Sequence, residues 1–129
     1  MTGTSGASTL SILYLEDERL LAVDFAGQLA LLGFGEVLVA HSLEAAEAAL
    51  AGRRVDLAFL DVTLGGGESS VALGRRLAAE GTQVVFHSGY GRSDIADGLK
   101  GFDLLEKPVS EAALKRSMAR AVRAATGGA

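Results

Sequence analysis

Short runs of consecutive apolar residues alternate along this chain with longer segments in which apolar residues recur at helical spacing. The apolar runs fall near residues 10–15, 36–40, 55–60, 83–87 and 102–106. They are apolar nearly throughout rather than at every second position, which is typical of parallel strands covered on both faces. These runs therefore predict the buried strands of a parallel sheet.

The segments between the runs predict helices near residues 18–32, 43–51, 68–80 and 110–124. Apolar stripes mark the first and third of them, formed by Leu20, Val23 and Leu31, and by Val71, Leu73 and Leu77. Serines and glycines stand where helices should begin and end, at Ser42, Ser110, Gly33, Gly52 and Gly81. Strands and helices that alternate over short connections predict an α/β, doubly wound sheet with helices on both faces.

A further helix is expected near 92–98, the fourth along the chain. This segment contains Asp94, Asp97 and Gly98 and has little apolar face. We therefore expect the fourth helix to be short or mobile.

Composition narrows the class of protein. At 129 residues the chain fits one domain, expected over residues 10–125 with disordered tails at 1–9 and 126–129. Because cysteine is absent, neither a disulfide framework nor a thiolate metal site can form. The net charge of −4 argues against direct nucleic-acid binding. No signal-peptide pattern opens the chain, and no apolar run approaches the roughly 18 residues of a membrane span. We expect a cytoplasmic protein.

Four of the apolar runs lead directly into residues that suit phosphoryl transfer. They end at Glu16-Asp17-Glu18, at Asp61, at Ser88 and at Lys107-Pro108. Since the carboxyl ends of parallel strands lie along one edge of a sheet, these residues are expected to share a pocket. Glu18 fits equally well as an acid that opens a helix.

The acids of this pocket point to a magnesium site and a nucleophile. Glu16, Asp17 and Asp61 would repel one another, so at least one of their pKa values would rise. Mg²⁺ prefers such oxygen ligands, and the backbone carbonyl of Thr63 could supply another. Asp61, kept ionised, could then attack phosphorus and form an aspartyl phosphate. The Lys107 amine and the Ser88 hydroxyl would neutralise the phosphoryl oxygens.

These motifs resemble the receiver domains of two-component response regulators. The matching segments are Leu15-Glu16-Asp17-Glu18, Phe59-Leu60-Asp61-Val62, Phe86-His87-Ser88-Gly89 and Glu106-Lys107-Pro108. The resemblance covers roughly residues 10–125. It implies a flavodoxin-like five-stranded sheet in the order 2-1-3-4-5, Mg²⁺-dependent transfer from a phosphohistidine to Asp61, and slow self-hydrolysis. By the same resemblance Asp61 is the phosphoacceptor, Glu16 and Asp17 are the metal-side acids, Ser88 is the switch hydroxyl and Lys107 the invariant lysine. Glu16 replaces the more usual aspartate, and Ser88 the more usual threonine.

Two positions depart from the usual receiver pattern. Leu104 stands three residues before the lysine, where receivers usually carry a switch aromatic. The segment Phe86-His87-Ser88-Gly89-Tyr90 resembles instead the FAT GUY motif of an alphaproteobacterial subfamily, which makes Tyr90 the expected switch aromatic. The second departure is Gly65-Gly66-Gly67, which predicts a pliant loop where receivers often have a proline.

The leading hypothesis is a stand-alone response regulator that accepts a phosphoryl group. It is expected to catalyse only its own phosphorylation and dephosphorylation, and not to be an enzyme otherwise. It would signal through protein contacts or a phosphorelay, with a histidine kinase or histidine phosphotransferase docking near the first helix and the site loops. The FAT GUY likeness suggests the general stress response.

One alternative is a small aspartyl-phosphate phosphotransferase, although Thr63 occupies the position of the second aspartate of haloacid dehalogenases. Another is a binding module that works without phosphorylation. A phosphohistidine at His87 is disfavoured, because His41 is the one other histidine and no helical His-Glu context exists.

Overall fold

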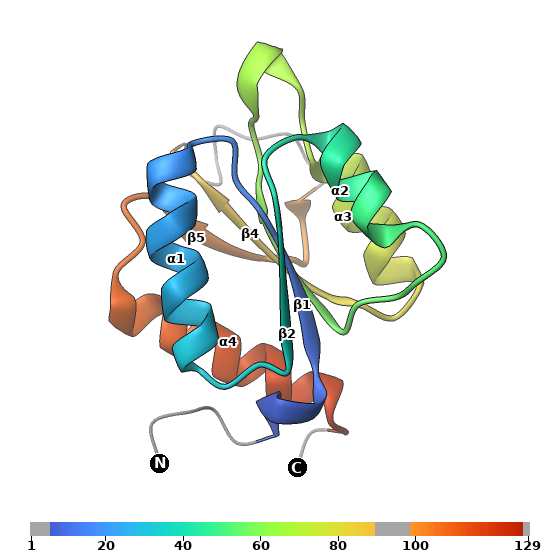
Figure 1. The fold of residues 1–129 in the computed structure, drawn as a ribbon, viewed down its shortest axis with the longest axis vertical. Helices are drawn as coiled ribbons and strands as arrows, with labels where there is room; N and C mark the ends of the chain where they lie inside the picture. Colours follow the sequence, from blue (N-terminus) through green and yellow to red (C-terminus); the bar gives the residue numbers. More distant parts are fainter. Residues whose placement is uncertain (1–5, 90–98, 128–129) are drawn as a thin grey trace.

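Five parallel strands form a single sheet in the order β2-β1-β3-β4-β5 in the computed structural model, which describes residues 6–89 and 99–127. This confirms the predicted class, strand order and parallel pairing (Figure 1). The strands are β1 (Ser11–Leu15), β2 (Glu36–Ala40), β3 (Leu57–Asp61), β4 (Gln83–Ser88) and β5 (Asp103–Glu106). The three central strands are almost fully buried, whereas β2 and β5, at the two edges, are partly exposed.

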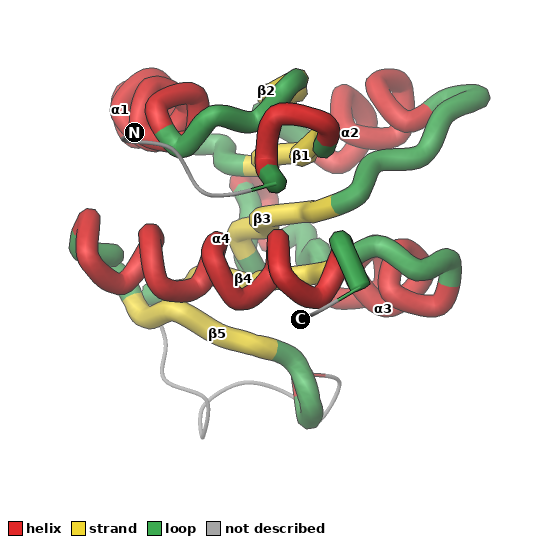
Figure 2. Tube along the Cα trace, turned by 90° about the horizontal axis from the view of Figure 1, so that it is seen from below, coloured by secondary structure: helices red, strands yellow, loops and turns green. Residues whose placement is uncertain are grey.

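Four α-helices of the described residues cover the two faces of the sheet (Figure 2). They are α1 (Arg19–Leu31), α2 (Leu43–Leu50), α3 (Val71–Ala79) and α4 (Glu111–Ala125). Helices α1 and α4 pack on one face, and α2 and α3 on the other. Ser42 and Ser110 cap α2 and α4 as expected, because each hydroxyl accepts a hydrogen bond from the backbone N–H three residues later. None of the described helices is long and apolar enough to cross a membrane.

The third helix begins later than its sequence pattern predicts. Residues 65–67 form a 3₁₀ turn, η2 (Gly65–Gly67), and Thr63 pairs with Ser69 in an isolated antiparallel bridge. This closed loop delays the helix to Val71, and it projects beyond the carboxyl ends of the strands (Figure 1). The helix expected near 92–98 lies outside the described residues.

The amino-terminal segment is more ordered than expected. Residues 7–9 form a 3₁₀ turn, η1 (Ala7–Thr9), and Ala7 is fully buried. Its carbonyl accepts hydrogen bonds from the backbone N–H groups of Leu10 and Gly35. The prediction of a disordered tail is therefore wrong for residues 7–9, because small residues let this turn pack against the end of the sheet.

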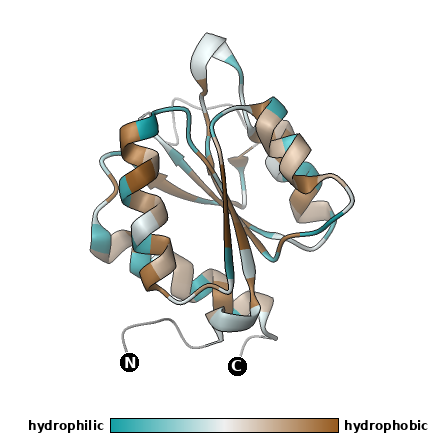
Figure 3. Cartoon of the chain, viewed as in Figure 1, coloured by the Kyte–Doolittle hydropathy of each residue, from teal (hydrophilic) through white to brown (hydrophobic). Residues whose placement is uncertain are grey.

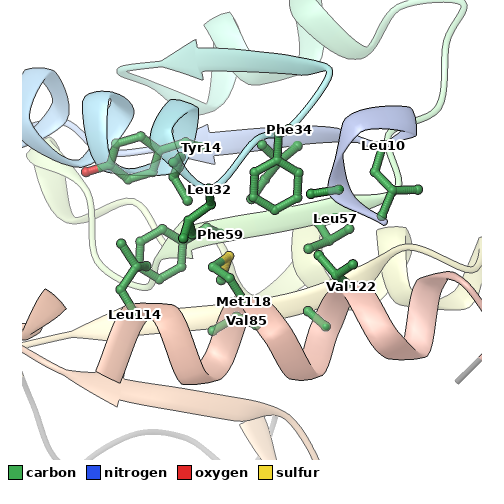
Figure 4. Packing of buried hydrophobic residues seen from close by; sticks show 14 of the residues in the cluster. Leu10, Tyr14, Leu32, Phe34, Leu57, Phe59, Val85, Leu114, Met118 and Val122 are labelled. Carbon is green, nitrogen blue, oxygen red and sulfur yellow. The ribbon is translucent and has the colours of Figure 1, made fainter. Parts of the chain in front are cut away.

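Two hydrophobic clusters, one on each face, hold the layers together. Figure 4 shows the cluster between the sheet and the helices α1 and α4, where Phe59 and Val85 of the strands meet Leu114 and Met118 of α4. The opposite cluster joins the sheet to α2 and α3 and includes Leu73 and Leu77, as the stripe on the third helix predicts.

Helix α1 buries a different face from the one that the sequence stripe marks. Leu20, Val23 and Leu31 are 85%, 74% and 72% exposed. The residues that pack on the sheet are Ala22, Phe25 and Leu29. Figure 3 shows apolar residues around much of this helix, so its periodicity does not select one face.

Helix α3 packs closely against the sheet at Gly74. A Cβ at this position would overlap the ring of Phe86, lying 2.9 Å from its Cε1 and 3.2 Å from Cδ1 of Leu60. We expect Gly74→Ala to lower the free energy of unfolding by about 1–3 kcal/mol, despite the better helix propensity of alanine.

Gly27 of α1 is the matched control, because no atom lies within 4 Å of its added Cβ. Gly27→Ala should raise the free energy of unfolding by about 0.5–1 kcal/mol. Urea denaturation of both variants measures the two effects. Equal changes for the two alanines would contradict the close contact of α3 with Phe86.

Candidate functional site

The register of the sheet brings polar residues of four strand ends into one row. Leu15 of β1 pairs with Leu60 of β3, so Glu16 and Asp61, which follow them, are lateral neighbours. Asp61 pairs in turn with His87 of β4, and His87 with Leu105 of β5, two residues before Lys107. Because alternate side chains of a strand share a face, these residues lie on the side of the sheet that α1 covers.

Lys107 joins the two buried carboxylates of this row. Its ammonium donates a hydrogen bond to Oδ2 of Asp61 at 2.9 Å and lies 3.3 Å from Oε1 of Glu16. Its backbone N–H donates to the carbonyl of Ser88 at 2.7 Å, and the Lys107–Pro108 peptide is cis. The predicted grouping of Glu16, Asp61 and Lys107 is therefore present in the structure.

Glu16 is only 1% exposed, and contacts of both its backbone and its side chain hold it in place. Its backbone N–H donates to the carbonyl of Ala40, and its own carbonyl contacts Nδ1 of His41 at 3.0 Å. Its Oε2 accepts a hydrogen bond from the backbone N–H of Glu18 at 3.2 Å. The ends of β1 and β2 thus fix this carboxyl group against the sheet.

The pKa values of the two buried acids, Glu16 and Asp61, are both raised, and burial is the largest cause. Burial raises the pKa of Glu16 to about 7, helped by a hydrogen bond with Asp61 and by the negative charge of Asp61. Burial also raises the pKa of Asp61, although the nearby Lys107 opposes that change. Burial would lower the pKa of Lys107, but its hydrogen bond to Asp61 and the two negative charges outweigh this and raise it. The expected rise in a carboxyl pKa is confirmed at Glu16.

Asp17 and Thr63 lie at the exposed side of this pocket. The Asp17 side chain faces the glycine loop, since its Oδ2 would lie 3.3 Å from a Cβ added at Gly65. Its charge helps to raise the pKa of Asp61, which places it near that carboxylate. Thr63 lies two residues beyond Asp61, at the bridge that closes the same loop.

Ser88 is buried and is the last residue of β4, next to Glu106 of β5 in the register. Tyr90, the expected switch aromatic, lies outside the described residues. Leu104 is half-buried in β5 and packs against the cluster on the opposite side of the sheet, between the strands and α2 and α3.

His87 is a site residue that sequence reasoning missed, because we considered it only as a phosphohistidine. It is 2% exposed, and its ring stacks at a tilt on Phe59 with 4.2 Å between ring centroids. Its Nδ1 lies 3.8 Å from Oε1 of Glu16. Burial, together with the positive charge of Lys107, lowers the pKa of this imidazole to about 3. Successive side chains of a strand point to opposite faces of the sheet, and His87 directly precedes Ser88 at the end of a buried strand. This alternation is the signal that could have placed His87 on the same face of the sheet as Asp61.

The residues present fit a divalent cation. Two carboxylates share a buried site with one ammonium, and Oε1 of Glu16 receives no hydrogen bond within the described part of the chain. Oxygen ligands on one edge of a pocket, with an exposed acid beside them, match the donor set that Mg²⁺ prefers. Glu16, Asp17, Asp61 and the Thr63 carbonyl could therefore hold such an ion.

Similarity to known proteins is found through structure. No protein-family model matches the chain, and no curated protein matches it in sequence. A CheY-like response regulator receiver domain from Methylobacillus flagellatus is 30% identical, over 84% of this chain and 95% of that one, with a TM-score of 0.71. SdrG from Sphingomonas melonis Fr1 is 29% identical, over 89% and 97% of the two chains, with a TM-score of 0.73. The response regulator REC domain of PhyR from Erythrobacter litoralis shares the fold at 20% identity, over 88% and 90%, with a TM-score of 0.73.

The strand order, the acids and lysine at the strand ends, and the sequence identity along nearly the whole length of a receiver domain agree. We conclude that this chain belongs to the receiver domain family of response regulators, the CheY-like signalling domains.

Proposed function

We propose that the chain is a response regulator receiver domain that accepts a phosphoryl group on Asp61. The observation that carries this proposal is the position of that carboxylate: it ends a buried strand, is 3% exposed, and contacts the Lys107 ammonium at 2.9 Å. A carboxylate that is buried, yet paired with a cation at the open edge of a sheet, suits nucleophilic attack on phosphorus. The chain would then act as a signalling domain rather than as an enzyme on other substrates.

Phosphorylation would proceed by attack of an Asp61 oxygen on the phosphorus of a donor phosphohistidine. The new O–P bond forms as the P–N bond breaks, and the bonding electrons return to the donor imidazole, which takes up a proton. Lys107 would neutralise one phosphoryl oxygen, and the Ser88 hydroxyl would hold another. In the free protein Lys107 already contacts the carboxylate that would be modified.

Mg²⁺ is proposed as the cofactor, with Glu16, Asp17, Asp61 and the Thr63 carbonyl to hold it. When bound it supplies positive charge that the phosphoryl oxygens need. The pKa of Glu16 is raised first by burial and then by its hydrogen bond with Asp61 and the negative charge of Asp61, and an added cation would oppose this rise. Asp17, being exposed, is the acid best placed to receive an ion from solvent.

A histidine kinase or histidine phosphotransferase is proposed as the phosphoryl donor. Receiver domains interact with such proteins, and α1 offers an apolar surface beside the site. Its exposed residues Leu20, Val23 and Leu31 lie along a helix that begins just after the acids of the β1 end. A soluble domain rarely leaves such large side chains this exposed on one helix without a partner.

Readout is proposed through Tyr90, and a role in the general stress response is proposed from the FAT GUY likeness. Leu104 cannot serve as the usual switch aromatic, because it is aliphatic and packs toward α2 and α3. Tyr90 follows two residues after Ser88 in the same motif, and the Ser88 hydroxyl would touch the phosphoryl group. A change at Ser88 would therefore reach Tyr90 along the chain.

Loss of the nucleophile should abolish phosphorylation. With Mg²⁺ and acetyl phosphate the wild type should gain the mass of one phosphoryl group, and Asp61→Asn should gain none. Chelation of Mg²⁺ by EDTA should also prevent the gain in mass. Asp24→Asn, an exposed acid on α1, is the matched control and should be modified like the wild type. Modification of Asp61→Asn to the wild-type extent, measured by intact mass spectrometry, would mean that Asp61 is not the acceptor.

The apolar surface of α1 should matter for a protein donor and not for a small one. Leu20→Ser combined with Val23→Ser should slow transfer from a phosphorylated histidine phosphotransferase at least roughly tenfold, because burying each side chain is worth about 1.5–3 kcal/mol. Labelling by acetyl phosphate should be unchanged. Val39→Ser, on the edge strand β2, removes a comparably apolar side chain elsewhere and should affect neither reaction. Equal slowing by Val39→Ser would argue against docking on α1.

The switch aromatic can be tested by comparing Tyr90→Ala with Leu104→Ala. Both variants should be phosphorylated normally, but only Tyr90→Ala should lose the phosphorylation-dependent binding of a downstream partner. Capture of partners by the beryllofluoride-loaded protein measures that binding. A Tyr90→Ala protein that binds its partner like the wild type would exclude this role.

A further inference from the structure

We propose that Glu16, Asp61 and His87 form a second cation site, which takes a divalent transition-metal ion such as Zn²⁺ through the His87 imidazole. Its ligands differ from the proposed magnesium set, since His87 replaces Asp17 and the Thr63 carbonyl. The site uses the Asp61 carboxylate but does not require that Asp61 be phosphorylated.

The geometry of the sheet assembles the three ligands. One ligand atom from each of Glu16, Asp61 and His87 lies within 4.8 Å of the other two. This closeness follows from the register, because the residues occupy neighbouring positions on β1, β3 and β4 and face the same side. Asp17 is not a member of this group.

Two buried polar atoms of the group lack hydrogen bonds. Oε1 of Glu16 and Nε2 of His87 make none within the described residues, although the side chains are only 1% and 2% exposed. Oε1 of Glu16 faces Nδ1 of His87 at 3.8 Å, which is too long for a hydrogen bond. Buried polar atoms are normally paired. Oε1 of Glu16 has the Lys107 ammonium at 3.3 Å as an ionic partner, whereas Nε2 of His87 has no hydrogen-bond partner among the described residues.

The donor set suits a borderline metal better than Mg²⁺. Imidazole nitrogen is a preferred ligand of Zn²⁺ and its neighbours in the first transition row, whereas Mg²⁺ favours oxygen alone. An imidazole can offer one nitrogen lone pair to a metal, and Nε2 of His87 makes no hydrogen bond within the described residues. Zinc ligands at about 2.0–2.2 Å would bring neighbouring ligand atoms to roughly 3.3 Å, which side-chain rotation from the present spacing can reach.

Lys107 shows that a cation is stable at this point. Its ammonium contacts Asp61 at 2.9 Å and Glu16 at 3.3 Å, between the carboxylates that zinc would bind. The Lys107 side chain is 25% exposed, so its ammonium has a route to solvent. Zinc would therefore compete with Lys107, and by occupying Asp61 it would hinder phosphorylation.

Titration with Zn²⁺ alone, followed by isothermal calorimetry, tests the site. The wild type should bind one ion, and His87→Leu should weaken binding at least tenfold. His41→Gln is the matched control, because His41 is the one other histidine of the chain, and should bind like the wild type. The absence of cysteine removes thiolate ligands from the background. Lys107→Met should strengthen zinc binding by removing the competing ammonium.

A second readout uses the ¹⁵N signals of the two imidazoles in the wild type. Zinc should shift a ring-nitrogen signal of His87 and leave those of His41 in place, a result that stands even if His87→Leu fails to fold. Unchanged zinc affinity in a folded His87→Leu protein, or a shift confined to His41, would overturn the proposal. The beryllofluoride response of the wild type with Mg²⁺ and no zinc tests the proposed function separately, so either idea can fail alone.

Discussion

The parallel register of the central strands is the constraint on which the site depends. It places the residue after β1, the last residue of β3 and the penultimate residue of β4 side by side, and thereby lines up Glu16, Asp61 and His87. Slipping one strand by a single residue would turn its functional side chain to the opposite face of the sheet. The two hydrophobic clusters that fix the register therefore also fix the chemistry.

The charges at this row of residues are not balanced among themselves. Two nearly buried carboxylates share a single ammonium, so the group retains negative charge when both acids are ionised. Ionised groups are costly to bury unless they are fully paired, which is why the pKa of Glu16 is raised. An additional cation or a proton would relieve this imbalance.

Helix α1 carries an exposed apolar surface in addition to its buried face, and its sequence does not distinguish the two. Its buried face is formed by Ala22, Phe25 and Leu29, while Leu20 and Val23 point away from the sheet. A helix that only stabilised the fold would need just one of these two faces. The second apolar face lies on the helix that follows the acids of the β1 end, and it is the surface proposed for docking of a protein partner.

Sequence alone was enough to establish the order of strands and helices, the buried character of the central strands, and the acids, serine and lysine at the strand ends. These features are local: an unbroken apolar run or a serine cap depends on neighbouring residues, and the family motifs are short. The buried face of α1 could not be predicted, because apolar residues lie around the helix and only packing selects between them. The early turn at residues 7–9 depends on contacts with Gly35, far along the chain. The approach of His87 to Glu16 was likewise decided only by the tertiary structure, since it arises from the register of strands that are separated by three α-helices along the chain.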